Sequence, residues 1–246
     1  MNYNNFFLKT DSYKLSHFSQ YPTGTTKVYS YIESRGGKFD EVLFFGLQKA
    51  IQDINDNFPT MADVEEAKTF TELHGVPFNY KGAKALVELG YLPIKISAVK
   101  EGMVLPVKNV LAVIENTLPE FYWLPSFLEP RLLSAVWYAS TVATYSKECK
   151  KIIKKYLELT SDNTDSLPFK LHDFGYRGAS SDTTAGIGGA AHLINFSGTD
   201  TMEGILTAMR YYDSNVCAYS VVAAEHSTIT SHGKDGEAAA YEKLID

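Results

Sequence analysis

The chain has 246 residues, of which 45% are hydrophobic, and it carries a formal net charge of −6 with a pI near 5.6. This length and apolar content suit a globular protein of one or two domains with a sizeable core. The acidic balance argues against nucleic acid as a partner, because phosphate binding needs a basic excess.

One lysine-rich stretch, "SKECKKIIKKY" at 146–156, is the nearest candidate for an anion-binding patch, although its helical spacing favours a solvated helix face. Two cysteines far apart in the sequence predict neither a disulfide framework nor a zinc site. We find no signal-peptide core and no apolar run of roughly 18 residues, so we predict a cytoplasmic protein.

The first part of the chain mixes strand and helix patterns. Dense Tyr, Val and Ile favour strands, and apolar spacing closed by glycine favours helices. The expected elements are a strand at 27–34, a helix at 41–54, helices at 61–75 and 81–93 that close at Gly75 and Gly90, and a small β element at 94–116 that turns at Glu101 and Gly102.

The pattern from 120 to about 159 is helical, and we expect Pro125 and Pro130 to kink or divide it. Ser, Asp, Asn and Pro make 160–168 a linker. Beyond it, strand and helix alternate, which favours parallel βαβ units. The expected strands lie at 169–174, near 195–196 and at 218–224, and the expected helices at 181–194 and 201–212.

We therefore place a domain boundary near residue 165, between regions 1–165 and 166–246. Three strands are too few to close an α/β barrel, which generally takes eight strands and about 250 residues. The last helical pattern is still running at residue 246, so we expect the sequence to be the front part of a longer one.

Chemically versatile side chains gather where the first two of these strands end, and this edge is where α/β folds bind ligands. Arg177 beside a helix start could help to cradle a phosphate or pyrophosphate, although it could instead pair with Asp173. Phe174 or Tyr176 could stack on an aromatic ring. Asp200, after the next strand, could accept a hydrogen bond from an amide or ring N–H.

Several features in the same region have plainer interpretations. His192 lies in an apolar helix, and we interpret it as a core histidine. The glycines Gly186, Gly188 and Gly189 indicate close packing of helix and sheet, because the full dinucleotide fingerprint is absent. "DFG" at 173–175 lacks the companion motifs of a kinase.

His226 follows the last predicted strand, with Glu225 beside it. It could act as an acid, a base or a nucleophile toward phosphorus, or it could simply cap a helix. His232 and Lys234, in "HGKD", lack the spacing of a phosphate-binding loop and receive no role.

Three segments carry a family resemblance: "TDSYKLSHFSQYPTGTTKVYSYIESR", "LHDFGYRGASSDTTAGIGGAAHLINFSGTDT" and "YSVVAAEHSTIT". In order and in register from about residue 8, they resemble the nicotinamide phosphoribosyltransferase family, whose members are about twice as long. The resemblance implies a type II phosphoribosyltransferase fold, an α+β domain over 1–165 followed by the first part of an irregular α/β barrel over 166–246. It also implies a homodimer.

The resemblance implies transfer of the phosphoribosyl group of phosphoribosyl pyrophosphate to nicotinamide, with magnesium, driven by ATP through a phosphohistidine. His226 would be phosphorylated, and Asp200 would hydrogen-bond the carboxamide and repel the carboxylate of nicotinate. The other implied contacts with substrate or product are Phe174 and Tyr13 stacking on the base, Asp11 reaching with Tyr13 into the partner subunit's site, Ser220 and Val221 lining the base pocket, and Arg177 and Arg35 holding phosphate.

The sequence departs from the family's pattern at Phe169, Val222 and His232, where tyrosine, proline and tryptophan are usual. We expect these changes to bear on the shape of the pocket and not on the chemistry. A chain ending at residue 246 is also expected to lack a complete active site. The alternatives to the family's main activity are a nicotinate phosphoribosyltransferase of the same fold and a non-catalytic subunit that binds nucleotide or pairs with a longer chain.

Overall fold

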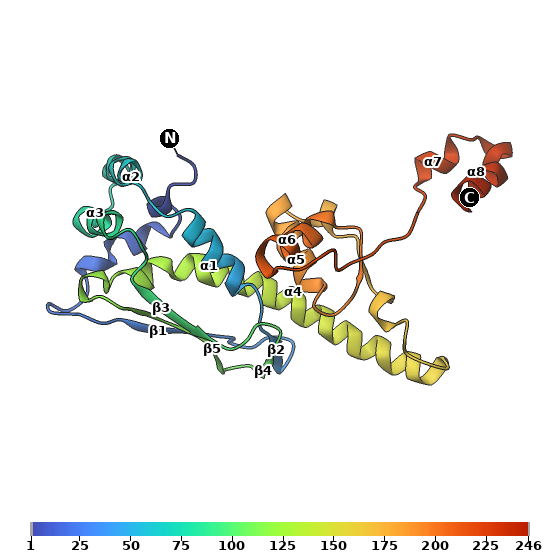
Figure 1. Cartoon of the computed structure of the whole chain (residues 1–246), viewed down its shortest axis with the longest axis horizontal. Helices are drawn as coiled ribbons and strands as arrows, with labels where there is room; N and C mark the ends of the chain where they lie inside the picture. The colour runs from blue at the N-terminus through green and yellow to red at the C-terminus, as the bar shows by residue number, and fades with distance from the viewer. Residues whose placement is uncertain (1, 246) are drawn as a thin grey trace.

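The computed structural model describes residues 2–245, and Met1 and Asp246, the outer ends of the two predicted domains, lie outside it. An N-terminal part with a sheet, a central group of helices and a C-terminal helical pair follow one another along the long axis (Figure 1). The long helix α4, Leu124–Thr160, runs through the first two of these parts and holds them together.

The N-terminal part is built on a three-stranded antiparallel sheet of order β1-β5-β3. The strands are β1 (Tyr29–Glu33), β3 (Ile94–Ala98) and β5 (Val110–Asn116), and a separate pair joins β2 (Glu41–Leu43) to β4 (Val104–Pro106). The predicted strand at 27–34 and the β element at 94–116 are confirmed. Two 3₁₀ segments, η1 (Phe6–Leu8) and η2 (Ser12–Ser19), precede the sheet, and η3 (Pro119–Phe121) follows it.

Helices α1 (Leu47–Asp56), α2 (Met61–His74) and α3 (Tyr80–Leu89) cover this part. The predicted ends of α2 and α3 are confirmed, since Gly75 and Gly90 both follow the last helical residue with positive φ. The predicted helix at 41–54 begins too early, because residues 41–43 form β2. Gly46, with φ of 102°, turns the chain into α1, and a Cβ there would lie 2.7 Å from the Ala135 carbonyl oxygen.

The long helix was expected to be kinked or divided at its prolines, and it is not divided. Pro125 lies in the first turn of α4, where the missing N–H has no helical partner in any case. Pro130 lies farther inside and removes one backbone hydrogen bond, yet the 37-residue helix continues. Buried packing along the helix, which includes Leu128, Leu132 and Val136, outweighs that loss.

Parallel βαβ units follow, as the alternating pattern predicts. The elements are η4 (Leu167–Phe169), β6 (His172–Asp173), η5 (Tyr176–Gly178), α5 (Asp182–His192), β7 (Gly198–Thr199) and α6 (Met202–Tyr212). Strand β6 pairs with β7 in parallel, and Gly198 bridges in parallel to Tyr219.

These strands are shorter than the sequence predicts. The strand expected at 169–174 keeps two residues, because the 3₁₀ turn η4, which contains Pro168, extends to Phe169. The strand expected at 218–224 keeps only the bridge at Tyr219, and Val221 and Val222 beyond it are 80% and 82% exposed. A run of strand-forming residues needs a paired neighbour to become a strand.

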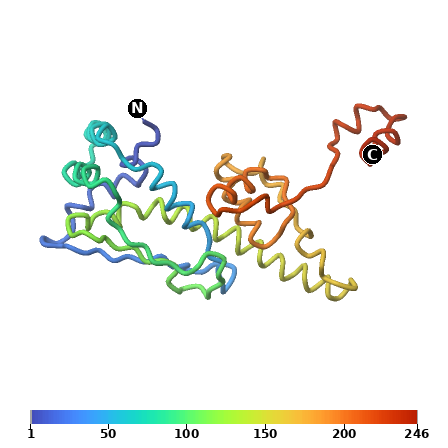
Figure 2. Tube along the Cα trace, viewed as in Figure 1, coloured from blue at the N-terminus to red at the C-terminus, as the bar shows by residue number. Residues whose placement is uncertain are grey.

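The last part contains α7 (His226–Thr230), η6 (Lys234–Gly236) and α8 (Glu237–Ile245). An extended segment carries it away from the central helices (Figure 2). Of the helices in residues 2–245, none has the combination of length and apolar sequence that would let it span a bilayer.

Two buried clusters hold the fold. The larger lies between the sheet, α1 to α3 and the start of α4, and includes Phe6, Phe7, Phe44, Leu124 and Leu128. The smaller cluster joins Leu43 and Phe45 to α4 and α5, through Ala139, Ala143, Ala190 and Ala191. The core therefore continues across residue 165, and it fixes the βα units on the surface of α4.

Candidate functional site

The candidate site is the carboxyl edge of the short parallel strands. Phe174 follows β6 directly, Asp200 follows β7, and Ser220 follows the bridge residue Tyr219. Parallel strands end at the same edge of a sheet, so one register brings these three residues together although they are far apart in sequence. The Asp200 amide donates to the Asp173 carbonyl at 2.8 Å, which continues the β6–β7 ladder into the site.

Asp200 is the most highly connected side chain of the site. The Ser220 hydroxyl donates to its Oδ1, and His172 Nε2 lies 2.8 Å from the same oxygen. The hydrogen bond from Ser220, followed by that from His172, holds the pKa of Asp200 below its ordinary value. Asp200 is therefore an ionised hydrogen-bond acceptor at neutral pH, set between two donors.

Phe174 presents an aromatic surface beside this carboxylate. Its side chain is 63% exposed, and its ring lies 4.7 Å, centroid to centroid, from the ring of His172. An exposed phenylalanine normally costs hydrophobic free energy, so its position next to an anchored carboxylate is suited to a flat ligand that stacks and donates a hydrogen bond. Val221, also exposed, follows Ser220 at the same edge.

The loop between β6 and α5 carries Arg177. The alternative in which Asp173 pairs with Arg177 is not what the structure shows: Asp173 Oδ1 accepts from the Gly175 amide at 2.7 Å, and no ion pair joins the two within residues 2–245. Tyr176 donates to Asp182 at 2.7 Å, which raises the pKa of the phenol. Arg177 is exposed beside the start of α5.

The helix after this loop begins as the sequence predicts. Ser181 accepts from the Thr184 amide at 3.1 Å and caps α5. Its glycines were expected to allow close packing of helix and sheet, and most of their contacts are with helices instead: Gly186 faces Thr207 and Gly189 faces Gly204, both in α6, and Gly188 faces Tyr138 of α4. Gly189 also lies near a strand residue, Asp173 of β6. The predicted core histidine is confirmed, since His192 is 7% exposed, lies 3.2 Å from the Gly198 carbonyl oxygen, and has its pKa lowered by burial.

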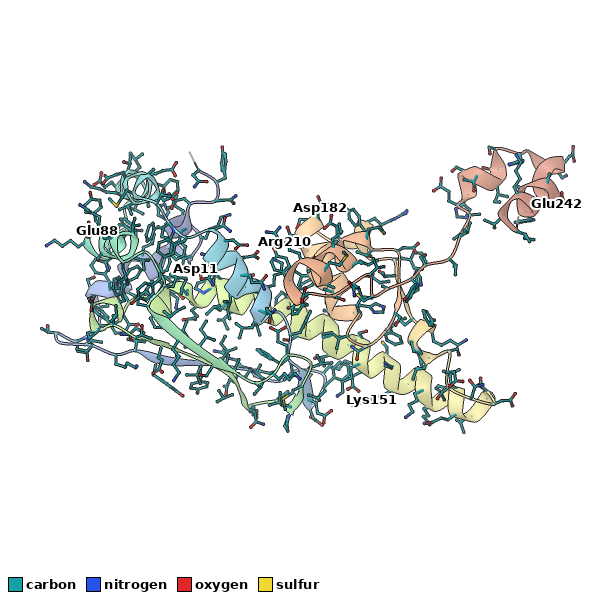
Figure 3. The ribbon with its side chains drawn as sticks, in the orientation of Figure 1. Asp11, Glu88, Lys151, Asp182, Arg210 and Glu242 are labelled. Atoms are coloured by element: carbon teal, nitrogen blue, oxygen red, sulfur yellow. The ribbon has the colours of Figure 1, made fainter. Side chains whose placement is uncertain are left out.

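The remaining expected site residues do not meet this cluster within the chain. Asp11 and Tyr13 lie at the start of η2, and Tyr13 is 56% exposed with its ring edge against His17. Figure 3 shows Asp11 in the N-terminal part, well away from Asp182 at the start of α5. Arg35 follows β1 and is also exposed.

His226, the expected phosphorylated residue, is the first residue of α7 and is exposed. The Glu225 amide donates to Thr228 Oγ1 at 3.2 Å and caps this short helix. Figure 1 places α7 apart from α5 and α6, the helices that follow β6 and β7, so the described chain does not bring His226 next to Asp200.

His172 is the site residue to which sequence reasoning gave no role. Its position one residue before Asp173 in the predicted strand was visible, but its contact with Asp200 depends on the register between β6 and β7. For the expected magnesium, no group of three His, Cys, Asp or Glu side chains that could hold a metal occurs in residues 2–245.

Two family descriptions match separate parts of the chain. "Nicotinamide phosphoribosyltransferase, N-terminal domain" matches residues 5–96, and "Nicotinate phosphoribosyltransferase (NAPRTase) family" matches residues 169–245. The second match contains all three strand-end residues of the candidate site.

Curated relatives extend these matches over nearly the whole chain. A nicotinamide phosphoribosyltransferase of Xanthomonas campestris is 50% identical over 98% of this chain and 52% of its own length. One from Acinetobacter baylyi is 32% identical over 96% of this chain and 50% of its own length. The chain thus spans about half the length of the curated relatives it matches.

A solved structure supports the fold. The crystal structure of human nicotinic acid phosphoribosyltransferase superposes on 91% of this chain and 40% of its own chain, with a TM-score of 0.64 and 19% sequence identity. The predicted α/β class and type II phosphoribosyltransferase fold are therefore confirmed.

Proposed function

Because the chain belongs to the nicotinamide phosphoribosyltransferase family, we propose that the protein transfers the phosphoribosyl group of phosphoribosyl pyrophosphate to nicotinamide. The products are nicotinamide mononucleotide and pyrophosphate, as in the salvage of NAD. The observation that carries the proposal is the ionised Asp200 held between two donors beside the exposed ring of Phe174.

The reaction explains why a site of this kind is useful. The ring nitrogen of nicotinamide forms a bond to C1 of the ribose while the bond from C1 to the pyrophosphate oxygen breaks, and positive charge develops on the sugar. Nicotinamide is a weak nucleophile, so the rate depends on holding its ring in line. Phe174 would stack on the ring and Asp200 would accept from the carboxamide, with Ser220 and Val221 beside them.

The other contacts in the proposal rest on motif positions. Arg177 and Arg35 are exposed cations suited to phosphate groups, and a guanidinium can bind two phosphate oxygens at once. Asp11 and Tyr13 lie away from the cluster in this chain, and the proposal assigns them to the site of a second subunit in a homodimer. Tyr13 would then cover the face of nicotinamide opposite Phe174.

Magnesium and ATP also belong to the proposal. We propose that ATP phosphorylates His226 and so makes the transfer more favourable. The exposure of His226 at the start of α7 supports its access to a nucleotide. We also propose a cytoplasmic location, where phosphoribosyl pyrophosphate and ATP are available.

The test uses the native protein that contains this chain. It is incubated with nicotinamide, phosphoribosyl pyrophosphate, magnesium and ATP, and nicotinamide mononucleotide is measured by chromatography. We expect the product to form with nicotinamide and only weakly with nicotinate. Absence of product from both bases would refute the proposed activity and favour the non-catalytic subunit.

A second candidate is nicotinate phosphoribosyltransferase, favoured by the match of residues 169–245 to that family. The two activities differ in the charge of the base. A carboxylate from nicotinate would face the ionised Asp200 and be repelled, which argues for nicotinamide. Turnover of nicotinate in preference to nicotinamide would establish the second candidate.

A further inference from the structure

Both hydrogen bonds to the Asp200 carboxylate go to one of its two oxygens. His172 Nε2 and the Ser220 hydroxyl both contact Oδ1. No hydrogen bond to Oδ2 is present anywhere in residues 2–245. Two donors arriving from different strand ends fix the plane of the carboxylate and leave Oδ2 as the oxygen that can accept from a ligand.

The same imidazole also supports the aromatic surface. The rings of His172 and Phe174 are 4.7 Å apart at an angle of 36°, and no other ring contacts Phe174 in the described chain. One face of Phe174 thus rests on His172, while the side chain as a whole stays 63% exposed. His172 is in contact with both groups that would bind the base.

The backbone of β7 fixes the position of this imidazole. His172 is paired with Gly198, and a Cβ at Gly198 would lie only 2.7 Å from His172 Nδ1. The Nδ1 edge of the ring therefore lies close to the glycine, and the ring can be there only because the glycine has no side chain. Since a carboxylate only accepts, Nε2 carries the hydrogen of the bond to Asp200.

We infer that His172 is a positioning residue for the base: its N–H aims the Asp200 carboxylate at a carboxamide, and its ring backs the stacking face of Phe174. This inference rests on the proposed function. The N–H of His172 orients Asp200 through Oδ1 and leaves Oδ2 for the ligand, where it would accept from the carboxamide and repel the carboxylate of nicotinate. The lowered pKa of Asp200, caused by Ser220 and His172, agrees with this arrangement.

Two substitutions separate the two contacts. His172→Phe keeps a ring against Phe174 and removes the donor, whereas His172→Gln keeps an N–H at about the reach of Nε2 and removes the ring. A hydrogen bond to a charged group contributes about 1.5–3 kcal/mol, which corresponds to roughly tenfold or more in affinity. His172→Phe should raise KM for nicotinamide by about tenfold and weaken the preference over nicotinate, with kcat within about twofold.

His172→Gln should keep the preference for nicotinamide, because the donor to Asp200 remains, and its KM should rise less. His74→Phe, at the exposed end of α2, is the control for replacing a histidine by phenylalanine far from the site. If both His172 variants lose kcat and kcat/KM equally without any change of base preference, the residue is merely structural and the inference is wrong.

A measurement without substrate separates this inference from the proposed activity. Carbon NMR of labelled aspartate follows the titration of Asp200 in the wild type and in both variants. The pKa of Asp200 should rise in His172→Phe and stay near the wild-type value in His172→Gln. An unchanged pKa in His172→Phe would overturn the inference even in an active enzyme. If the wild-type protein forms no product, the proposed function fails, whereas the titration still decides whether His172 controls Asp200.

Discussion

Gly189 in α5 and Gly204 in α6 lie backbone to backbone. A Cβ built on Gly189 would be 2.7 Å from Gly204 Cα, and one built on Gly204 would be 2.8 Å from Gly189 Cα. The two helices that follow β6 and β7 therefore touch through their main chains. This contact sets the spacing of the two βα units and so helps to hold Phe174 and Asp200 in register.

Gly204→Ala should destabilise the protein, because the added methyl group must push the two helices apart. Overpacking of this kind costs typically about 1–3 kcal/mol, which exceeds the gain of up to about 1 kcal/mol from replacing glycine by alanine within a helix. Urea unfolding measures the difference. Gly37→Ala is the control, since no atom lies within 4 Å of a Cβ there. A higher midpoint for Gly204→Ala would show that the contact is not tight.

Local signals predicted those helix boundaries that are marked by a capping residue. The ends of α2 and α3 follow from Gly75 and Gly90, and the start of α5 follows from Ser181, because caps depend on residues close in the chain. Of the kink or division expected at Pro130, the division does not occur, since tertiary packing decides whether a helix continues past a proline. The predicted strand lengths were wrong for a similar reason, because the sequence of one segment does not show which other strand it pairs with.

In the candidate site, too, some features could be predicted from the sequence and others could not. The placement of Phe174 and Asp200 at strand ends follows from the order of the elements and is observed. The bond from His172 to Asp200 requires the register of β6 against β7, in which His172 pairs with Gly198. The roles proposed for Asp11 and Tyr13 remain predictions, because they depend on a second chain.

Because of Tyr211, the stability of the folded protein depends on pH in the alkaline range. Its hydroxyl donates to Asp53 of α1 at 2.7 Å, and burial together with this carboxylate raises the pKa of Tyr211 to about 12. The folded protein thus binds the phenol proton more tightly than the unfolded chain, where the pKa is about 10. The stabilisation is complete below pH 10 and is lost as the pH rises toward about 12.

The free energy of unfolding of the wild type should therefore fall, between pH 10 and pH 12, on the order of 2 kcal/mol more than that of Tyr211→Phe. Urea unfolding at several pH values gives both curves. Tyr156→Phe, on the exposed face of α4, should keep the wild-type slope. Parallel curves for the wild type and Tyr211→Phe would contradict the assignment.

Asp200→Asn tests how the base is selected. The amide keeps the size of the carboxylate but removes its charge and turns one acceptor into a donor. KM for nicotinamide should rise by about tenfold or more, and nicotinate should become a usable substrate because repulsion disappears. Steady-state kinetics with each base measures both effects. Asp162→Asn, in the exposed linker, is the control. An unchanged preference would mean that another group reads the substituent of the ring.

His226 should carry phosphate after incubation with ATP. The residue is exposed at the start of α7, and its segment also contains a second exposed histidine, His232, so the chain offers its own control. A phosphate on an imidazole nitrogen is lost in acid and kept in base, unlike a phosphate ester of serine or threonine. With ATP labelled in its γ-phosphate, the native protein should take up acid-labile label. His226→Gln should abolish this uptake and His232→Gln should keep it. Label that survives in His226→Gln, or that resists acid, would place the phosphate on another residue and remove His226 from the coupling to ATP.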